Sequence, residues 1–291
     1  MAVSVLGILV PVAACVVAAW LVSRMSRGRS VGPRRGNVLI MLGVGVLVGV
    51  ALFVLGGAVF GPALGLVQMA APGVGALVVL VGLIASPGTG GTASSSEAEL
   101  APRGWNRLGP AWLYGAPAGA VVVMVTAILF FGASGSPDDQ GRQRIISVDS
   151  GFMAATASPY PGWYYGLPAL ALALVLLVAT VVALARIARH PLRGTSQERE
   201  AAREWRAGLA RVVMAVGTGS ALLYTGAMSV MASSATSSVT EGTFSDETGK
   251  QFAWDLPVLD ALAVLELGVG LCAIIIGLFL WASAIVTAAR R

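Results

Sequence analysis

Long apolar stretches alternate with short polar or basic connections along this chain. Seven stretches reach the roughly 20 residues that an α-helix needs to cross a bilayer core of about 30 Å. They cover residues 3–22, 38–60, 66–85, 111–132, 166–187, 208–231 and 257–285. The third is the weakest, because Pro72 and several glycines interrupt it. This pattern predicts an all-α, polytopic integral membrane protein in which residues 1–291 form a single transmembrane domain of seven helices.

The composition excludes a water-soluble globular protein for these 291 residues. Hydrophobic residues make up 56% of the chain, charged residues make up 11%, and the mean hydropathy is +0.82. Soluble domains carry about a quarter charged residues. So little charge does not cover the surface of a soluble globule of this size. The same numbers exclude a disordered chain and a nucleic-acid-binding domain.

The basic residues are unevenly distributed between the two sides that seven spans define. Sixteen of the 19 fall on one side, and the other side holds Arg142, Arg144 and Lys250. Because arginine and lysine are retained in the cytoplasm, we expect the N-terminus outside and the C-terminus inside. The Arg-rich inner loops are then expected to contact anionic lipid headgroups. The arginine-rich, lysine-poor usage indicates a bacterial protein, and hence the bacterial plasma membrane.

The connections differ in character. Residues 86–108 form a Gly/Ser/Thr-rich cytoplasmic linker, and residues 133–165 and 232–256 form two long outer loops. The run Arg144–Val148 in the first loop is typical of a short strand. Residues 196–207 predict a cytoplasmic helix that continues into the sixth span. Thr195 and Glu198 have the spacing of a capping box at its start. This helix is either a solvated extension of the span, which we favour, or a docking helix for a partner.

Two helical hairpins follow a similar plan. Arg103–Trp105 precedes the fourth span, and Arg203–Trp205 precedes the sixth. On the outer side, Trp163–Pro168 opens the fifth span and Trp254–Pro257 opens the seventh. Interfacial aromatic residues and an early proline are ordinary in membrane helices. The likeness therefore reflects either an internal duplication or two hairpins that obey the same interface rules.

Residues for catalysis or cofactor binding are sparse. Zinc and haem sites need several His, Cys or carboxylate ligands, and the chain has one histidine, His190, and two cysteines, Cys15 and Cys272. Cys15 ends a stretch that resembles a lipoprotein cleavage box. No basic residue precedes that stretch, so we expect the first span to be retained. Lys250 lies in a loop, which excludes a retinal Schiff base. Ser220 has no base in the membrane and is expected to pack helices. We expect no cofactor, no metal and no enzymatic activity.

Glu266 is the residue that departs from the apolar pattern, because it lies inside the seventh span. Intramembrane carboxylates mark functional sites by default. Asp255 is eleven residues earlier, about 20° around the helix from Glu266, so we expect the two carboxylates to share one face and to form a candidate intramembrane polar site. Glu266 therefore either binds a cation, a proton or a cationic group in a cavity open to the outside, or has a structural role. In the second case, which we favour, it is protonated or pairs with Arg142 or Arg144.

These features favour a non-catalytic multi-pass membrane protein, a permease-like or accessory subunit of a transport system. Its expected partners are the lipid bilayer and a cytoplasmic ATPase or another membrane subunit. The alternative is a membrane sensor or interaction protein that binds a ligand through its acidic outer loops. A lipid-modifying enzyme ranks last, because no catalytic constellation is available inside the membrane.

Overall fold

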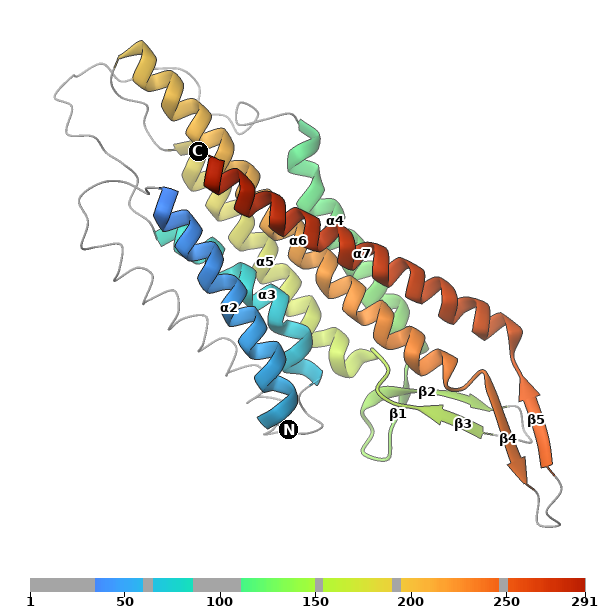
Figure 1. Cartoon of the computed structure of the whole chain (residues 1–291). Coiled ribbons are helices and arrows are strands. Elements are labelled where there is room, and N and C mark those ends of the chain that lie inside the picture. The colour runs from blue at the N-terminus through green and yellow to red at the C-terminus, as the bar shows by residue number, and fades with distance from the viewer. Residues whose placement is uncertain are drawn as a thin grey trace. The chain divides into compact units, whose positions relative to one another are not determined.

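The computed structural model describes residues 35–59, 65–85, 111–149, 154–189, 195–245 and 251–290. This part of the chain is mostly helical, and six of its helices are long and apolar enough to cross a membrane (Figure 1). The protein is therefore membrane-embedded. The predicted first span at 3–22 and the linker at 86–108 lie outside the described residues, as do Cys15 and His190.

The six helices occupy the sequence that the second to seventh apolar stretches cover. Their bounds are α2 Arg35–Val59, α3 Gly65–Ala85, α4 Ala111–Ser134, α5 Trp163–Arg189, α6 Ser196–Ser237 and α7 Pro257–Arg290. Large apolar side chains remain exposed on several of them, and on α7 Phe279 is 70% exposed. A helix that is apolar on every side suits a protein interior on one face and lipid tails on the other.

Helix α6 is one continuous helix of 42 residues that includes the predicted segment 196–207. The expected capping box is present at its start. The backbone N–H of Thr195 donates to the Glu198 carboxylate at 2.7 Å, and the N–H of Glu198 faces the Thr195 hydroxyl at 3.4 Å. This reciprocal pair satisfies two of the donors that a helix N-terminus leaves open.

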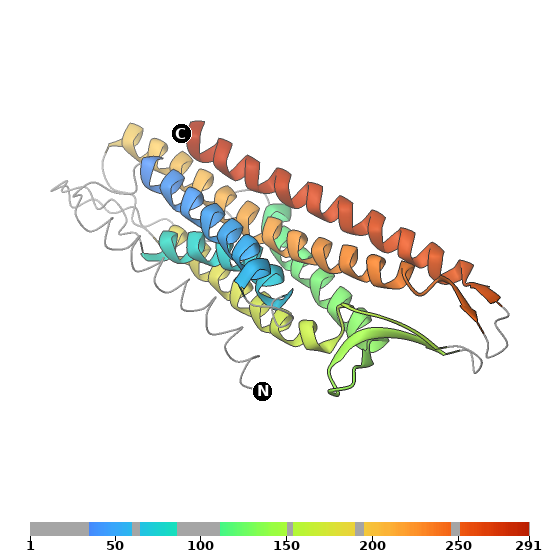
Figure 2. The same ribbon diagram turned by 60° about the horizontal axis from the view of Figure 1, so that its bottom comes forward.

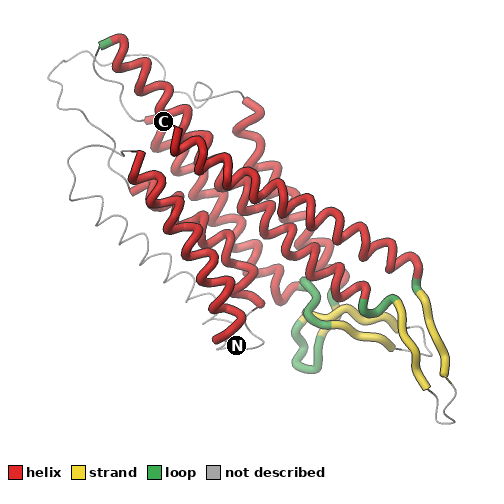
Figure 3. Tube along the Cα trace, viewed as in Figure 1, coloured by secondary structure: helices red, strands yellow, loops and turns green. Residues whose placement is uncertain are grey.

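Two of the connections between helices contain strands (Figure 3). Between α4 and α5 lie β1 Ser136–Pro137, β2 Gln143–Asp149 and β3 Ala154–Ala157, and between α6 and α7 lie β4 Glu241–Ser245 and β5 Gln251–Asp255. All neighbouring pairs are antiparallel, with Ile146 opposite Ala157 and Gly242 opposite Trp254. The strand predicted at Arg144–Val148 is confirmed within β2. The other four are too short for the hydrophobic pattern to reveal, and they qualify the all-α prediction.

The chain divides into two compact units, which we describe separately. Unit 1 consists of residues 1–121, 172–221 and 277–291, and unit 2 consists of residues 122–171 and 222–276. Each unit contains parts of several helices. The five strands and Glu266 all belong to unit 2.

In unit 1, α2 and α3 lie side by side with their backbones in contact (Figure 2). A Cβ added at Gly45 would lie 2.7 Å from the carbonyl oxygen of Gly75, and one added at Gly75 would lie 2.6 Å from that of Gly45. Only glycine permits this approach. In a membrane, close backbone packing of this kind replaces the hydrophobic drive that water supplies elsewhere.

The unit 1 parts of α6 and α7 are joined in the same way. A Cβ at Gly219 would lie 2.9 Å from the carbonyl oxygen of Gly277. One turn of α7 later, the Trp281 indole N–H donates a 3.0 Å hydrogen bond to the Ser220 hydroxyl, and both side chains are buried. Ser220 thus packs helices together, as its sequence context predicts.

Candidate functional site

The described parts of unit 2 bury one acidic side chain, that of Glu266 in α7. It is 6% exposed. The Thr236 hydroxyl of α6 donates a hydrogen bond of 3.1 Å to its Oε2 atom. Its Oε1 atom is buried, and no described residue hydrogen-bonds to it. Oε2 is therefore fixed by a hydrogen bond, whereas Oε1 is a buried acceptor without a described donor.

The packing of α6 against α7 explains why these two residues meet. A Cβ at Gly270 would contact one turn of α6, with Gly226, Ser229 and Val230 all within 3.1 Å. Glu266 lies one turn earlier in α7, so its backbone is level with the next turn of α6. Helical side chains lean toward the N-terminus of their own helix. The carboxyl group therefore reaches along α6 to Thr236, in the last turn before α6 ends.

Helix α6 presents a row of buried hydroxyl groups that leads to this point. We call it the hydroxyl stripe; it consists of Thr225, Ser229, Ser233 and Thr236, which are 0–6% exposed. At 100° per residue these four positions fall within an arc of about 80°. The Ser233 hydroxyl donates to the Ala263 carbonyl oxygen of α7 at 2.7 Å. Sequence inspection missed the stripe, because the predicted span ended at residue 231 and placed Ser233 and Thr236 in the outer loop, whereas α6 continues to Ser237.

Tyr160, in the connection that follows β3, is also part of unit 2. It is 1% exposed, and its hydroxyl shares a 2.7 Å hydrogen bond with the Ser134 hydroxyl at the end of α4. The Phe131 ring stands edge-on to it at 6.0 Å between centroids. Burial raises the pKa of Tyr160, the bond with Ser134 acts against that rise, and the negative charge of Glu266 adds to it. Tyr160 and Glu266 therefore interact electrostatically.

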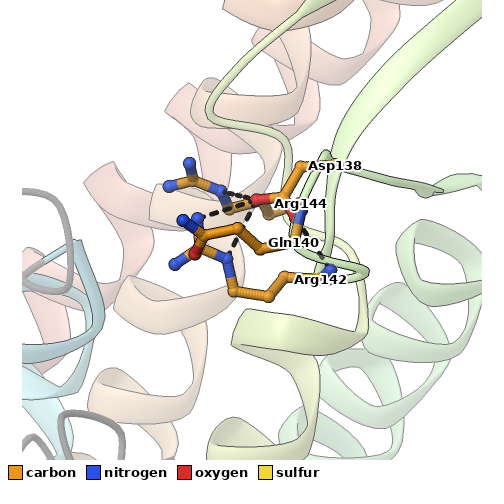
Figure 4. A network of polar contacts seen from close by, with 4 residues as sticks. All are labelled: Asp138, Gln140, Arg142 and Arg144. Atoms are coloured by element: carbon orange, nitrogen blue, oxygen red, sulfur yellow. Dashed lines mark hydrogen bonds and ion pairs between the residues drawn. The ribbon is translucent and has the colours of Figure 1, made fainter.

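The two arginines considered as partners of Glu266 form ion pairs within their own connection (Figure 4). The Nε atoms of Arg142 and Arg144 donate to Asp138 Oδ2 at 2.9 and 2.6 Å, while the backbone N–H groups of Gln140 and Arg142 donate to Oδ1. Gly141 turns the chain with φ +73°. We call these residues, Asp138 to Arg144, the aspartate turn. The pairing of Glu266 with either arginine is not among the contacts of the described residues.

The aspartate turn shifts the ionisation of its carboxyl group. Burial raises the pKa of Asp138, but the backbone N–H of Arg142 and the side chains of Arg144 and Arg142 outweigh that effect. The pKa of Asp138 therefore lies well below its usual range. The Arg142 guanidinium also lies 5.7 Å from the centroid of the Tyr164 ring, within reach of a cation–π contact.

Asp255 does not share a helical face with Glu266. Asp255 is exposed and ends β5, whereas α7 begins two residues later at Pro257. Proline disfavours the helical conformation of the residue before it, and it is accepted at the first helical position. The predicted angle of 20° extrapolated a helix across this boundary. The structure gives no contact between Asp255 and Glu266.

The chemistry open to this region is narrow. The described residues include no group of three or more His, Cys, Asp or Glu side chains able to hold a metal ion. Cys272 is exposed on α7. Glu266 and Thr236 supply the oxygen atoms that meet here, and Glu266 Oε1 is a carboxyl oxygen without a described partner. Such a group accepts a proton or a hydrogen-bond donor.

Comparison with known proteins gives no relative from which to transfer a function. No family model matches the chain. No curated protein and no solved structure matches it either.

Proposed function

We propose that this chain is a non-catalytic, multi-pass component of a transport system, either a permease-like or an accessory subunit, in a bacterial plasma membrane. The proposed topology has seven transmembrane helices, with the N-terminus outside and the C-terminus in the cytoplasm. Six apolar helices and the uneven distribution of arginine support it. In this topology the five strands face outward and the start of α6 faces the cytoplasm.

The observation that carries the proposal is the carboxyl group of Glu266. Inside a membrane bundle an ionisable side chain is costly, and it is retained where it binds an ion, a proton or a substrate. Glu266 is 6% exposed, has an oxygen without a described partner and lies at the end of the hydroxyl stripe. A purely structural carboxylate is expected to have both oxygens satisfied.

The partner of an accessory subunit would meet it on the cytoplasmic side. The first three turns of α6 extend beyond the apolar part of the helix and carry charges of both signs, including Glu198, Arg199 and Glu200. We therefore expect a cytoplasmic ATPase, or another membrane subunit, to contact this segment. Anionic lipid headgroups are expected at the remaining arginines.

Affinity purification from native membranes in a mild detergent tests this proposal. Mass spectrometry is expected to identify an ATP-binding subunit in the wild-type complex. A variant with Gln197, Arg199 and Glu200 all replaced by alanine, which leaves the capping box of Thr195 and Glu198 in place, is expected to lose it while inserting normally. A matched triple-alanine variant of Ser136, Asp139 and Gln140, on the opposite side in the proposed topology, is the control. Recovery of the chain alone from wild-type membranes contradicts the proposal.

The order in the connections favours a second candidate, a sensor that binds a ligand on its outer side. Both long loops carry antiparallel strands, and the aspartate turn fixes the first of them. Binding residues are disproportionately found on connections that a rigid scaffold positions. Replacing residues 139–157 with a short Gly/Ser linker is expected to abolish a ligand response and leave membrane insertion intact. An unchanged response would contradict the sensor.

A further inference from the structure

The described residues satisfy the carboxyl group of Glu266 only in part. One oxygen receives a hydrogen bond from Thr236, and the other receives none from the described residues. No described cationic side chain forms an ion pair with it, since the ion pairs of Arg142 and Arg144 are with Asp138. A carboxylate removed from water in this way is strongly destabilised in its charged form.

The groups around Glu266 restrict which ligand could neutralise its buried charge. Calcium takes six to eight oxygen ligands and magnesium about six, commonly from several carboxylates. The described residues that hydrogen-bond at this point offer one carboxyl group and the hydroxyls of Thr236 and Ser233. Ser233 already donates to Ala263. These groups are too few to coordinate a divalent metal ion. A single proton on Oε1, in contrast, removes the charge and needs no further ligand.

None of the described neighbouring groups competes with Glu266 for this proton or neutralises its charge. From the connection before α5, Tyr160 interacts with it, and burial keeps the pKa of that phenol above its ordinary value. From α6, Thr236 and Ser233 do not titrate. On α7 itself, Asp260 is exposed. Neither arginine of the aspartate turn is available, because Asp138 binds both.

We propose that Glu266 is a proton-binding site, with the proton taken up on Oε1 while Thr236 continues to hold Oε2. The proton comes from water at the strand-bearing side, and its uptake converts the carboxylate into a neutral carboxyl group. The proton is the ligand of the site on which the proposed function depends. Only the use of this proton in transport rests on that proposed function. Proton binding itself is tested on the isolated chain.

Labelling with dicyclohexylcarbodiimide provides the test, because this apolar reagent modifies protonated carboxyl groups within membranes. The full chain in liposomes is treated over a range of pH, and modification of the α7 peptide is measured by mass spectrometry. We expect modification at neutral pH that declines as the solution becomes alkaline. It should vanish in Glu266→Gln and persist in Asp260→Asn, the matched control on the same helix.

A second variant keeps the test independent of Glu266 itself. Thr236→Val removes the hydrogen bond that favours the charged form, and a hydrogen bond to a charged group is worth about one to two pH units. The pH of half-maximal labelling should therefore rise by about one unit. Ser229→Ala, elsewhere on the hydroxyl stripe, should leave it in place. Unlabelled but folded wild-type protein at neutral pH overturns the proposal, as does sodium protection that is independent of pH.

The outcomes separate this inference from the proposed function. Labelling of Glu266 without a co-purifying transport subunit supports the proton site and contradicts the transport role. A co-purifying subunit without labelling supports the transport role and contradicts the proton site. The protonated-carboxyl C=O band in infrared spectra, present in wild type and absent in Glu266→Gln, gives a reading that does not depend on the reagent. Its absence from the wild-type spectrum at neutral pH overturns the proposal.

Discussion

Two carboxyl groups in unit 2 have opposite surroundings. Asp138 accepts hydrogen bonds on both oxygens, from two backbone N–H groups and two arginines. Glu266 accepts one, from Thr236. A saturated carboxylate fixes the conformation of its own turn, whereas an unsaturated buried one is available to a ligand. Asp138, which lies close to two arginines in the sequence, thus has a structural role. Glu266, which has no basic residue near it in its span, is the candidate site.

Acid is expected to loosen the aspartate turn only well below neutral pH. The pKa of Asp138 is lowered in the folded protein, so its stabilising effect is complete above the unfolded value of about 3.9. It is lost as the pH falls through that value toward the folded one. Amide hydrogen exchange across β2 should therefore stay slow from neutral pH to about 4, after correction for intrinsic rates, and rise below it.

Asp138→Asn should reproduce the acid state at neutral pH, because asparagine keeps the shape of the side chain and loses its charge. Exchange across β2 is expected to be several-fold faster in this variant. Asp139→Asn, at the exposed neighbouring position, is the control and should exchange like the wild type. Equal exchange in all three proteins would show that the turn does not depend on the charge.

Substitutions of Tyr160 separate the contribution of its hydroxyl from that of its ring. Tyr160→Phe removes the hydrogen bond between Tyr160 and Ser134. The Ser134 hydroxyl still donates to the Phe130 carbonyl oxygen, so the free energy of unfolding is expected to fall by only about 0.5–1.5 kcal/mol. Tyr160→Ala also removes the buried ring beside Phe131, and about 3–5 kcal/mol is expected. Denaturant unfolding in detergent measures both. Equal costs would mean that the ring contributes nothing.

At the scale of whole elements, the helices follow from hydropathy because each must satisfy its backbone internally and face lipid. The start of α6 was also predictable, since Thr195 and Glu198 encode a local capping box. Strands β4 and β5 were not predictable, because five residues carry too little periodicity. The helical angle assigned to Asp255 failed for a local reason, the boundary at Pro257.

The site was only partly predictable, and its residues show why. Glu266 stands out in any hydropathy profile. Thr236 does not, because the predicted sixth span ended at residue 231 and placed it in the outer loop, whereas α6 continues to Ser237 and brings its hydroxyl to Glu266. Tyr160 is separated from Glu266 by more than a hundred residues of sequence, and its approach depends on the fold of the connection after β3.

Close helix packing is tested by adding one methyl group. Gly45→Ala would place its Cβ 2.7 Å from the Gly75 carbonyl oxygen, so α2 and α3 must move apart, at an expected cost of about 1–3 kcal/mol. Gly119→Ala in α4 meets nothing within 4 Å among the described residues. It should be neutral or stabilising by up to about 1 kcal/mol, from helix propensity. Thermal unfolding in one detergent compares them, and similar losses would contradict the close contact.

At the scale of the molecule, the distribution of arginine and the positions of the strands make one joint prediction. If the basic side faces the cytoplasm, Asp139 beside the strands and Gln197 at the start of α6 lie on opposite sides of the membrane. Single cysteines placed there by Asp139→Cys and Gln197→Cys, with Cys15 and Cys272 replaced by serine, test this in intact cells. An impermeant maleimide should label the first in intact cells and the second only after lysis. Labelling of both positions in intact cells would overturn the proposed topology and, with it, the outward position of the strands and the supply of protons from that side.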